Sequence, residues 1–389
     1  MTDQSPYRNN PIRSLHFVGT LHHGGIECWL MNLLRLRRPE IQFDFLTHAP
    51  GKFDAEAESL GATVHRNSMY HYYTYRDHWP LRKMMEQGNY DVVHIHAYPI
   101  SGPILRIAAE CGIPVRIDHS HNTSGNRGGR PIVSKCKRLY RQWIDMADVK
   151  KYATALLGCS GAAGRFSFGK YWETKETHKV VYCGIPVDAY NVDFNGDQRR
   201  TLCRRYGVPE DALVVGTIGS LSYQKNQSLL ISAFAELAKR DHRYFLFIAG
   251  EGKERSNLER QVRESSPGER IIMPGVCNNV ADLICHLFDS FCLPSRFEGL
   301  PVVLMESLCG GLHNVCSDVI TEEITGRLPH RFTTLRLRES VTKWADALEE
   351  SLQKKIPSRE GVALIRQTPF TIENSMNSLL ETYRRGLEG

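Results

Sequence analysis

The chain has 389 residues, of which 41% are hydrophobic and 24% are charged, and its formal net charge is +6. These proportions are typical of a soluble globular protein and exclude a fibrous, collagen-like or disordered chain. Because an ordinary domain takes about 150 residues, the length predicts two domains, or three. The mild positive charge is compatible with anionic ligands or an anionic membrane surface but identifies neither.

The eleven cysteines contain no Cys-x-x-Cys pair and lie mostly within apolar runs. A zinc site or a disulfide framework would need clustered spacing, so we expect reduced thiols, no metal and a cytoplasmic protein. Residues 1–10 are polar and lack the apolar segment of a signal peptide. The most apolar stretches, such as 244–250, are far shorter than the roughly 20 residues that cross a bilayer. We therefore expect neither secretion nor a membrane span.

The first half of the chain alternates short apolar, β-branched runs with helix-length segments. The segments 26–37 and 101–112 have apolar residues at helical spacing. Strands that alternate with helices favour a parallel sheet covered on both faces, so we predict a doubly wound α/β domain over 1–190. The expected strands lie near residues 14, 43, 91, 114, 153 and 179.

A stretch rich in Gly, Pro, Asp and Asn, 184–212, predicts a linker, after which the alternation restarts. A second Rossmann-like domain is expected over 191–370, and a final helix over 371–389 is expected to return to the first domain. Two such domains would face each other across a cleft at the carboxyl ends of their strands, where open α/β sheets bind ligands. The expected strands begin near residues 213, 244, 270, 289 and 312.

The segment 295–311, SRFEGLPVVLMESLCGG, combines two acids with a predicted loop-to-helix junction. Pro301 fits the first helical position, where its missing N–H costs nothing. The free N–H groups at such a helix start form a site for an anion such as a phosphate. Glu298 in the loop and Glu306 in the helix could hold sugar or ribose hydroxyls, or both could be surface acids.

Two further turns could contact phosphate. Lys225 and Asn226 lie between a predicted strand and a helix, where Lys is a point-charge partner for a diphosphate, although a lone Lys there is more often a solvated charge. Gly24 and Gly25 follow the first strand and would let a ligand approach the backbone. The turn is not the Gly-x-Gly-x-x-Gly fingerprint, which disfavours a nicotinamide enzyme.

His119 and His121 directly follow an apolar strand, at the expected cleft end of the sheet. Either could contact a reacting sugar, or both could be structural, since the chain has 16 histidines. The segment 134–147 is amphipathic and basic, with Lys137, Arg138 and Arg141 off its apolar stripe. It could lie on an anionic membrane surface or bury its aromatic residues in its own domain.

Four motifs in this order resemble those of the retaining glycosyltransferases of family 4. They are Gly-Gly-x-Glu at 24–27, His-Ser-His-Asn at 119–122, Lys-Asn at 225–226 and Glu-Gly-Leu-Pro-Val-Val-Leu-x-Glu at 298–306. The similarity is closest to the bacterial capsular and exopolysaccharide branch. It implies a GT-B fold and metal-independent, retaining transfer of a sugar from a nucleotide sugar, a UDP sugar, to an acceptor hydroxyl without a cofactor.

The resemblance also implies roles for the matching positions. Glu298 would contact hydroxyls of the donor sugar, and Glu306 would bind the ribose. Lys225 would neutralise charge that develops on the leaving diphosphate. His119, or else His121, would lie by the anomeric centre. The remaining substrate-binding positions are Gly24, Gly25, Asn226, Gly299, Leu300 and Pro301.

Two positions depart from the family pattern. Ser220 stands where many relatives carry Arg, so one of two cations on the diphosphate is missing unless another residue such as Arg296 compensates. His313 stands where Pro is common, a change expected to shape a strand rather than the chemistry.

These observations favour a cytoplasmic or inner-membrane-associated enzyme that extends a lipid-linked oligosaccharide of a surface polysaccharide. The alternatives are a GT-B enzyme that glycosylates a small soluble acceptor or epimerises a nucleotide sugar, and a catalytically weakened scaffold protein that binds nucleotide sugar. Nucleic-acid binding is disfavoured because the basic residues are dispersed.

Overall fold

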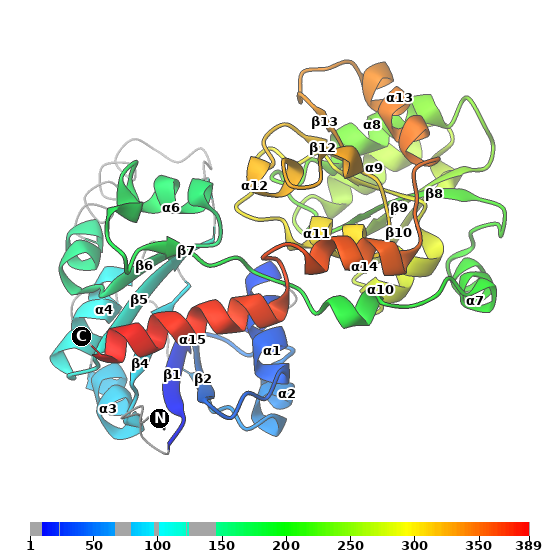
Figure 1. The fold of residues 1–389 in the computed structure, drawn as a ribbon. Helices are drawn as coiled ribbons and strands as arrows, with labels where there is room; N and C mark the ends of the chain where they lie inside the picture. Colours follow the sequence, from blue (N-terminus) through cyan, green and yellow to red (C-terminus); the bar gives the residue numbers. More distant parts are fainter. Residues whose placement is uncertain are drawn as a thin grey trace. The chain divides into compact units, whose positions relative to one another are not determined.

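The computed structural model of the chain describes residues 10–22, 24–66, 79–96, 101–121, 123 and 145–388. The chain divides into two compact units, Met1–Cys183 together with Ile372–Gly389, and Gly184–Thr371. Each unit contains one parallel sheet with helices packed on its faces (Figure 1). The predicted pair of doubly wound α/β domains is therefore confirmed.

The first unit has a seven-stranded sheet in the order β3-β2-β1-β4-β5-β6-β7, with parallel pairing throughout. Its strands are β1 (Ile12–Phe17), β2 (Ile41–Thr47), β3 (Val64–Arg66), β4 (Val92–Ile95), β5 (Val115–Ser120), β6 (Ala155–Gly158) and β7 (Lys179–Val180). Its described helices include α1 (Gly25–Arg35), α2 (Asp54–Ser59), α3 (Trp79–Gly88), α4 (Ser101–Glu110), α6 (Gly161–Phe168), η2 (Trp172–Thr174) and α15 (Ile372–Glu388).

The second unit has a six-stranded sheet in the order β10-β9-β8-β11-β12-β13, again parallel. Its strands are β8 (Leu213–Ile218), β9 (Tyr244–Ala249), β10 (Ile271–Gly275), β11 (Ser290–Leu293), β12 (Asn314–Ser317) and β13 (Phe332–Leu335). Its main helices are α7 (Gly196–Tyr206), α8 (Gln227–Leu237), α9 (Arg255–Glu264), α11 (Val302–Cys309), α13 (Val341–Ser351) and α14 (Ser358–Arg366). Its shorter helical segments are η3 (Val187–Tyr190), η4 (Gly268–Arg270), α10 (Val280–Asp282), η5 (Leu283–Leu287), α12 (Glu322–Thr325) and η6 (Pro329–Arg331).

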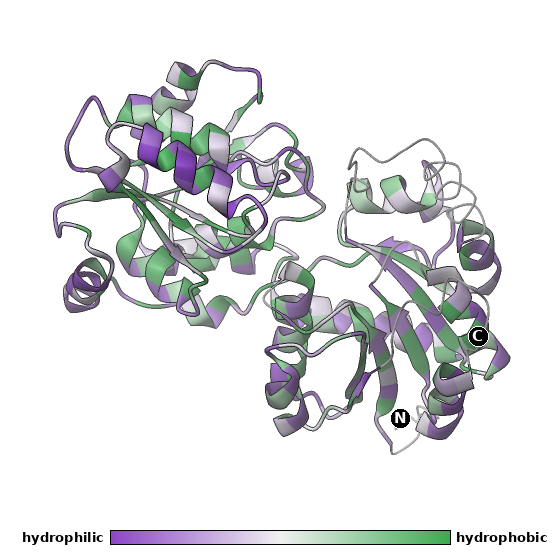
Figure 2. Ribbon diagram, turned by 180° about the vertical axis from the view of Figure 1, so that it is seen from behind, coloured by the Kyte–Doolittle hydropathy of each residue, from purple (hydrophilic) through white to green (hydrophobic). Residues whose placement is uncertain are grey.

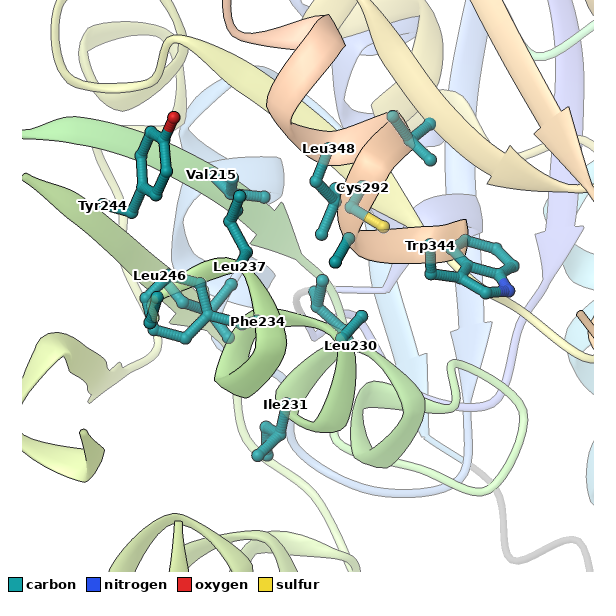
Figure 3. Packing of buried hydrophobic residues seen from close by; sticks show 14 of the residues in the cluster. Val215, Leu230, Ile231, Phe234, Leu237, Tyr244, Leu246, Cys292, Trp344 and Leu348 are labelled. Atoms are coloured by element: carbon teal, nitrogen blue, oxygen red, sulfur yellow. The ribbon is translucent and has the colours of Figure 1, made fainter. Parts of the chain in front are cut away.

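The core of the second unit shows why continuous apolar runs become strands here. All six residues of β9 are buried, as expected for a strand covered on both faces. Figure 2 shows hydrophobic strands inside each unit and polar residues on the outer helix faces. In Figure 3, side chains of α8 and α13, among them Phe234, Leu237 and Trp344, pack over the sheet residues Val215 and Leu246. Burial of such side chains supplies most of the stabilising free energy of the unit.

The order of both sheets contains a switch point, where successive connections turn in opposite directions. Strand β1 lies between β2 and β4 in the first sheet, and β8 lies between β9 and β11 in the second. Open α/β sheets bind ligands outside the carboxyl ends of the strands at this point. The loops after β1, β4, β8 and β11 are therefore the places to look for a site.

The first unit ends at Cys183, earlier than the boundary expected at residue 190. Ile185 N–H donates to Phe370 O at 2.9 Å, and η3 packs against α11 and α14, so this stretch belongs to the second unit. The expected linker at 184–212 also contains α7, whose N-cap Asn195 accepts hydrogen bonds from two backbone N–H groups. Helix α15 packs against α1 and β5 of the first unit (Figure 1).

Candidate active site

Lys225 and Glu298 form an ion pair at the carboxyl edge of the second sheet. Lys225 Nζ lies 2.7 Å from Glu298 Oε1, and Glu298 is only 7% exposed. The Ser295 hydroxyl donates to the same oxygen at 2.7 Å, and the Gln224 amide donates to Oε2 at 3.3 Å. Donors of this kind offset the cost of removing a carboxylate from water. Glu298 is thus a fixed, buried acid and not a solvated surface group.

The two loops that carry this pair follow the neighbouring strands β8 and β11, and hydrogen bonds join them. Asn226 has φ 56° and ψ 38°, a left-handed conformation that Asn tolerates better than most residues. Its Nδ2 donates to Pro294 O at 3.1 Å, and Arg296 Nη2 donates to its Oδ1 at 2.7 Å. The β8 loop also passes close to the backbone at Gly250. A Cβ at this position would lie 1.9 Å from Gly219 O, so the approach requires glycine. Asn226 therefore positions Lys225 against the loop of Glu298.

Helix α11 begins at Val302, so the prediction of Pro301 as the first helical residue is wrong by one position. Pro301 is the N-cap, with φ −76° and ψ 94°, and this ψ is extended rather than helical. Its carbonyl accepts the Leu304 N–H at 3.0 Å. Gly299 and Leu300 precede it and are buried. The start of α11 lies directly after the Glu298 loop, as the sequence indicates.

Glu306 lies within α11 and is partly buried. Burial raises the pKa of Glu306 to about 7, and a hydrogen bond with Tyr190 opposes part of this shift. Burial likewise raises the pKa of the Tyr190 hydroxyl, so it keeps its proton. Tyr190 is a partner that the sequence analysis missed, since nothing in the pattern indicates that η3 packs beneath α11.

The two departures from the family pattern lie in different surroundings. Ser220 is exposed, with its hydroxyl 3.3 Å from that of Ser222. Arg296 is also exposed and stacks over the Tyr223 ring, with its guanidinium carbon 4.4 Å from the ring centre. His313 is 2% exposed and contacts the Thr333 hydroxyl at 2.9 Å, next to β12. Arg296 is thus a cation beside the Lys225 loop, whereas His313 contacts a neighbouring strand.

In the first unit, Gly24 and Gly25 lie at the start of α1. Gly24 is the N-cap, and a Cβ on it would lie 2.1 Å from Glu27 Oε2. A Cβ on Gly25 would meet nothing within 4 Å. The fold itself does not require glycine at position 25, so any need for it there must come from a ligand.

His119 and His121 lie in a cluster of five buried or partly buried histidines. The rings of His119 and His121 have centroids 4.1 Å apart, and the indole of Trp29, on α1, is nearly perpendicular to the His119 ring, with the two centroids 5.6 Å apart. Burial lowers the pKa of every ring in the cluster, so all five are neutral at neutral pH. The other three members are His16, His94 and His96.

These three histidines were not predicted from the sequence, although the sequence contains a signal for them. Side chains alternate between the faces of a strand, so the two His-x-His motifs each place both rings on one face. The first motif, 94–96, runs from the end of β4 into the following loop, and the second, 119–121, does the same at the end of β5. These two strands are neighbours in the sheet. His16 on β1 pairs directly with His94. The strand order, which the sequence does not state, is what brings the rings together.

Two sets of three histidines in this cluster have nitrogens that all lie within 4.8 Å of one another. Neutral imidazole is the commonest metal ligand, so these residues are candidates for a metal site as well as for a hydrogen-bonded network. The sets are His16, His94 and His96, and His96, His119 and His121.

Most of the basic segment 134–147 lies outside the described residues, including Lys137, Arg138 and Arg141. Within the described part of the chain, no helix has both the length and the apolarity needed to cross a bilayer. No disulfide joins two cysteines within the same part of the chain.

Comparison with known proteins identifies the family. The model of glycosyl transferases group 1 matches residues 198–328, and the glycosyl transferase 4-like domain matches residues 24–168. The Bacillus subtilis protein EpsF, described as a glycosyltransferase, is 30% identical over 387 residues, which is 97% of each chain. The chain belongs to the group 1 glycosyltransferases.

Other members of this family and of the wider fold agree with that assignment. The capsular polysaccharide biosynthesis glycosyltransferase CapH of Staphylococcus aureus is 22% identical over 382 residues, 96% of this chain and 98% of CapH. The structure of Anabaena HepE in complex with UDP has a TM-score of 0.76 at 18% identity and covers 96% of this chain and 100% of HepE. These matches confirm a group 1 glycosyltransferase with the predicted GT-B fold, similar to a glycosyltransferase of capsular polysaccharide biosynthesis.

Proposed function

We propose that this glycosyltransferase moves a sugar from a UDP sugar to a hydroxyl of a growing, lipid-linked surface polysaccharide, with retention at the anomeric carbon and without a metal. The observation that carries the proposal is the Lys225–Glu298 pair at the switch point of the second sheet, directly before helix α11. HepE, which shares the fold, has been solved with UDP and with UDP-glucose. CapH is named for capsular polysaccharide biosynthesis.

The second unit would bind the donor. Glu298 would accept hydrogen bonds from hydroxyls of the sugar, and Glu306 would bind the ribose. In the transfer, the bond between the anomeric carbon and the diphosphate oxygen breaks, a bond from that carbon to the acceptor oxygen forms on the same face, and the proton of the acceptor hydroxyl passes to the departing diphosphate. Lys225 would stabilise the negative charge that develops on the departing diphosphate. The backbone before α11, Gly299–Pro301, would contact the sugar and the adjacent phosphate at the helix start.

Ser220 carries no positive charge, but Arg296, in the neighbouring loop after β11, could supply one. Arg296 bonds to Asn226, the neighbour of Lys225 in the chain, and its planar guanidinium can bind phosphate oxygens in a bidentate way. We propose that Arg296 supplies the second positive charge on the diphosphate. This role favours an active enzyme over a weakened scaffold.

The first unit would contribute to the acceptor side and to contact with the membrane. Near α6, Phe166 is 43% exposed and Tyr171 is 72% exposed, and the neighbouring Arg165 and Lys170 are exposed as well. Aromatic and cationic side chains together are typical of surfaces that rest on anionic lipid headgroups. A lipid-linked acceptor would bring the enzyme to such a surface.

Vesicle sedimentation tests this contact. The wild type should bind phosphatidylglycerol vesicles more strongly than phosphatidylcholine vesicles, and salt should weaken the binding. Serine at both Phe166 and Tyr171 should weaken it, whereas Phe194→Ser, which changes a residue 59% exposed in the second unit, should not. Equal binding by all three proteins would contradict the proposed surface.

Calorimetry with a panel of nucleotides and nucleotide sugars tests the proposed donor site. UDP should bind, and both Lys225→Ala and Glu306→Ala should weaken its binding. An exposed-site variant, Lys239→Ala, serves as the control because Lys239 lies just beyond α8, where it forms an exposed ion pair with Glu236. A folded protein that binds no nucleotide would overturn the proposal, and binding without turnover would favour the scaffold alternative.

A further inference from the structure

The histidine cluster of the first unit consists of two chains of hydrogen-bonded rings, each with a distinct polar group at its end. In one chain, His16 Nδ1 lies 3.1 Å from His96 Nε2, and His96 Nδ1 lies 2.9 Å from His121 Nε2. In the other chain, His94 Nε2 lies 3.1 Å from His119 Nδ1. A neutral imidazole has one N–H and one bare nitrogen, so the direction of one hydrogen bond dictates the direction of the next.

Ser14 sets the direction of the first chain. Its single hydroxyl hydrogen is donated to the Gln42 carbonyl at 3.0 Å, because a carbonyl can only accept. The contact of 3.2 Å between Ser14 Oγ and His16 Nε2 must then be donated by the ring. With its hydrogen on Nε2, His16 accepts at Nδ1 from His96, and the hydrogen of His96 is therefore on Nε2 as well.

The opposite end of this chain gives the same direction independently. His96 now has a bare Nδ1 and accepts from His121 Nε2, which leaves His121 Nδ1 bare. Cys183 Sγ lies 3.6 Å from that nitrogen. Burial raises the pKa of the Cys183 thiol well above its usual value, so the sulfur keeps its hydrogen and is the donor. Both ends therefore assign His121 an N–H at Nε2 and an acceptor nitrogen at Nδ1.

Tyr383 of helix α15 sets the direction of the second chain. Its buried hydroxyl lies 2.7 Å from His94 Nδ1 and has no other hydrogen-bond partner within the described residues. A buried hydroxyl donates its hydrogen wherever an acceptor is available, so Tyr383 donates to His94. His94 then donates from Nε2 to His119 Nδ1, and the hydrogen of His119 is on Nε2. That nitrogen is buried and makes no hydrogen bond in the described part of the chain.

We infer that Ser14 and Tyr383 are positioning residues, which fix His121 as a hydrogen-bond acceptor at Nδ1 and His119 as a donor at Nε2. In the structure the Cys183 thiol occupies His121 Nδ1 and His119 Nε2 is buried, so a sugar hydroxyl, which both donates and accepts, would bond to the two rings by taking the place of the thiol. The role in substrate binding rests on the proposed function, whereas the assignment of hydrogens does not. Tyr383 of the C-terminal helix α15 thereby contributes to the polarity of His119 through His94.

A metal ion is the competing explanation of the same cluster. The observed N···N separations of 2.9–3.1 Å are those of ordinary hydrogen bonds. A metal bound between two of these rings would need bare nitrogens on both, which the directions set by Ser14 and Cys183 do not provide. Uptake of a metal would therefore require the hydrogens of the chain to move.

Nitrogen NMR of the full chain labelled with ¹⁵N-histidine tests the assignment directly. Two-bond correlations between ring hydrogens and nitrogens distinguish the two neutral forms of each ring, and single His→Gln variants assign the signals. All five rings should carry hydrogen on Nε2. Hydrogen on Nδ1 of His121 or His119 in the wild type would overturn the inference. Stoichiometric binding of added Zn²⁺ that His96→Gln abolishes would also overturn it, in favour of a metal site.

Two matched pairs of variants test the positioning role. Tyr383→Phe removes the terminal donor of one chain, and its control Tyr90→Phe removes a buried hydroxyl that bonds to Asp44 instead. Ser14→Ala removes the terminal acceptor of the other, and its control Ser101→Ala removes a buried hydroxyl that bonds to Asp118. Only Tyr383→Phe and Ser14→Ala should produce a population with hydrogen on Nδ1, and Ser14→Thr should restore the wild-type spectrum.

The kinetic consequence is measured on the same proteins. Sugar transfer by Tyr383→Phe and Ser14→Ala should fall by up to about tenfold in kcat, the worth of one hydrogen bond, with UDP affinity unchanged. Unchanged spectra and unchanged rates in both variants would contradict the positioning role. A protein that transfers no sugar from any donor but shows the expected spectra would contradict the proposed function and leave the hydrogen assignment intact.

Discussion

Tyr190 and Glu306 share a hydrogen bond within the second unit, and burial raises the pKa of the Glu306 carboxyl to about 7. The two residues come from different elements, η3 and α11, so this contact attaches the start of the second unit to the helix of the proposed donor site. It also gives that helix a group that changes its charge near neutral pH.

The stability of the second unit should fall as pH rises toward neutrality. An unfolded chain releases the Glu306 proton near about pH 4.3, whereas the folded protein retains it up to about pH 7. The stability contributed by the protonated form is therefore fully present below the unfolded pKa and is lost as pH rises through the folded pKa. Glu306→Gln removes this contribution. Urea unfolding at about pH 5 and about pH 8 should show a smaller loss for the variant, by on the order of 1–2 kcal/mol.

Other buried acids require a comparison of slopes and not of single values. Burial raises the pKa of Asp118 to about 7 and that of Asp145 to about 6. Like Glu306, both groups therefore make the free energy of unfolding fall as pH rises. They are present in the wild type and in Glu306→Gln alike, and they cancel in the difference. Identical pH slopes for the two proteins would show that Glu306 does not titrate in this range.

Glu298→Gln should damage both catalysis and folding. The amide keeps the size of the side chain but removes the charge that faces Lys225 at 2.7 Å. Transfer rates should fall at least about 100-fold if Glu298 contacts the sugar during the reaction. Stability should fall by about 2 kcal/mol, less than the ~3–5 kcal/mol of a fully buried pair, because Lys225 is 16% exposed.

An exposed ion pair supplies the control for this change. Glu236→Gln breaks the contact with Lys239, in which both side chains are more than one third exposed. Its effect on stability should stay within about 0.5 kcal/mol and its effect on rate should be negligible. Initial rates and thermal unfolding of the two variants give the comparison. Equal rates for Glu298→Gln and Glu236→Gln would remove Glu298 from the site.

The sequence predicts much of this site because its signals are local. A strand, a loop with Glu298 and Gly299 and the start of a helix follow one another in the chain, so their order can be inferred without coordinates. The contact between Lys225 and Glu298 cannot be inferred in this way, since it depends on β8 and β11 being neighbours. The family resemblance places both residues in one site, but only the strand order explains how they meet.

The residues that the sequence analysis missed follow the same division. His16, His94 and Tyr383 are far apart in the chain, and β1, β4 and α15 bring them to one side of a sheet. The prediction that Pro301 is the first helical residue is wrong for a different reason. Proline is acceptable both as an N-cap and as the first helical residue, and its extended ψ of 94° is not visible in the sequence. Sequence patterns thus do not predict contacts between residues that only the fold brings together, or a helix boundary that depends on one dihedral angle.

Gly25→Ala should separate folding from ligand binding in the first unit. The added Cβ meets nothing within 4 Å, and alanine is a better helix former than glycine at the start of α1. The variant should therefore be as stable as the wild type. If a phosphate or sugar approaches this backbone, transfer should fall by about tenfold or more. Unchanged transfer in Gly25→Ala would show that no ligand contacts position 25.

Ser220→Arg should rescue an enzyme that has lost Arg296. Arg296 bonds to Asn226 beside Lys225, and Ser220 is exposed in the same loop, so either position can present a guanidinium without burying it. Arg296→Ala should weaken UDP binding by about tenfold, as expected for the loss of one charge-assisted contact. Adding Ser220→Arg to that variant should restore most of the affinity, measured by calorimetry. Arg296→Ala that binds UDP as tightly as the wild type would mean that the second cation comes from another residue or is dispensable.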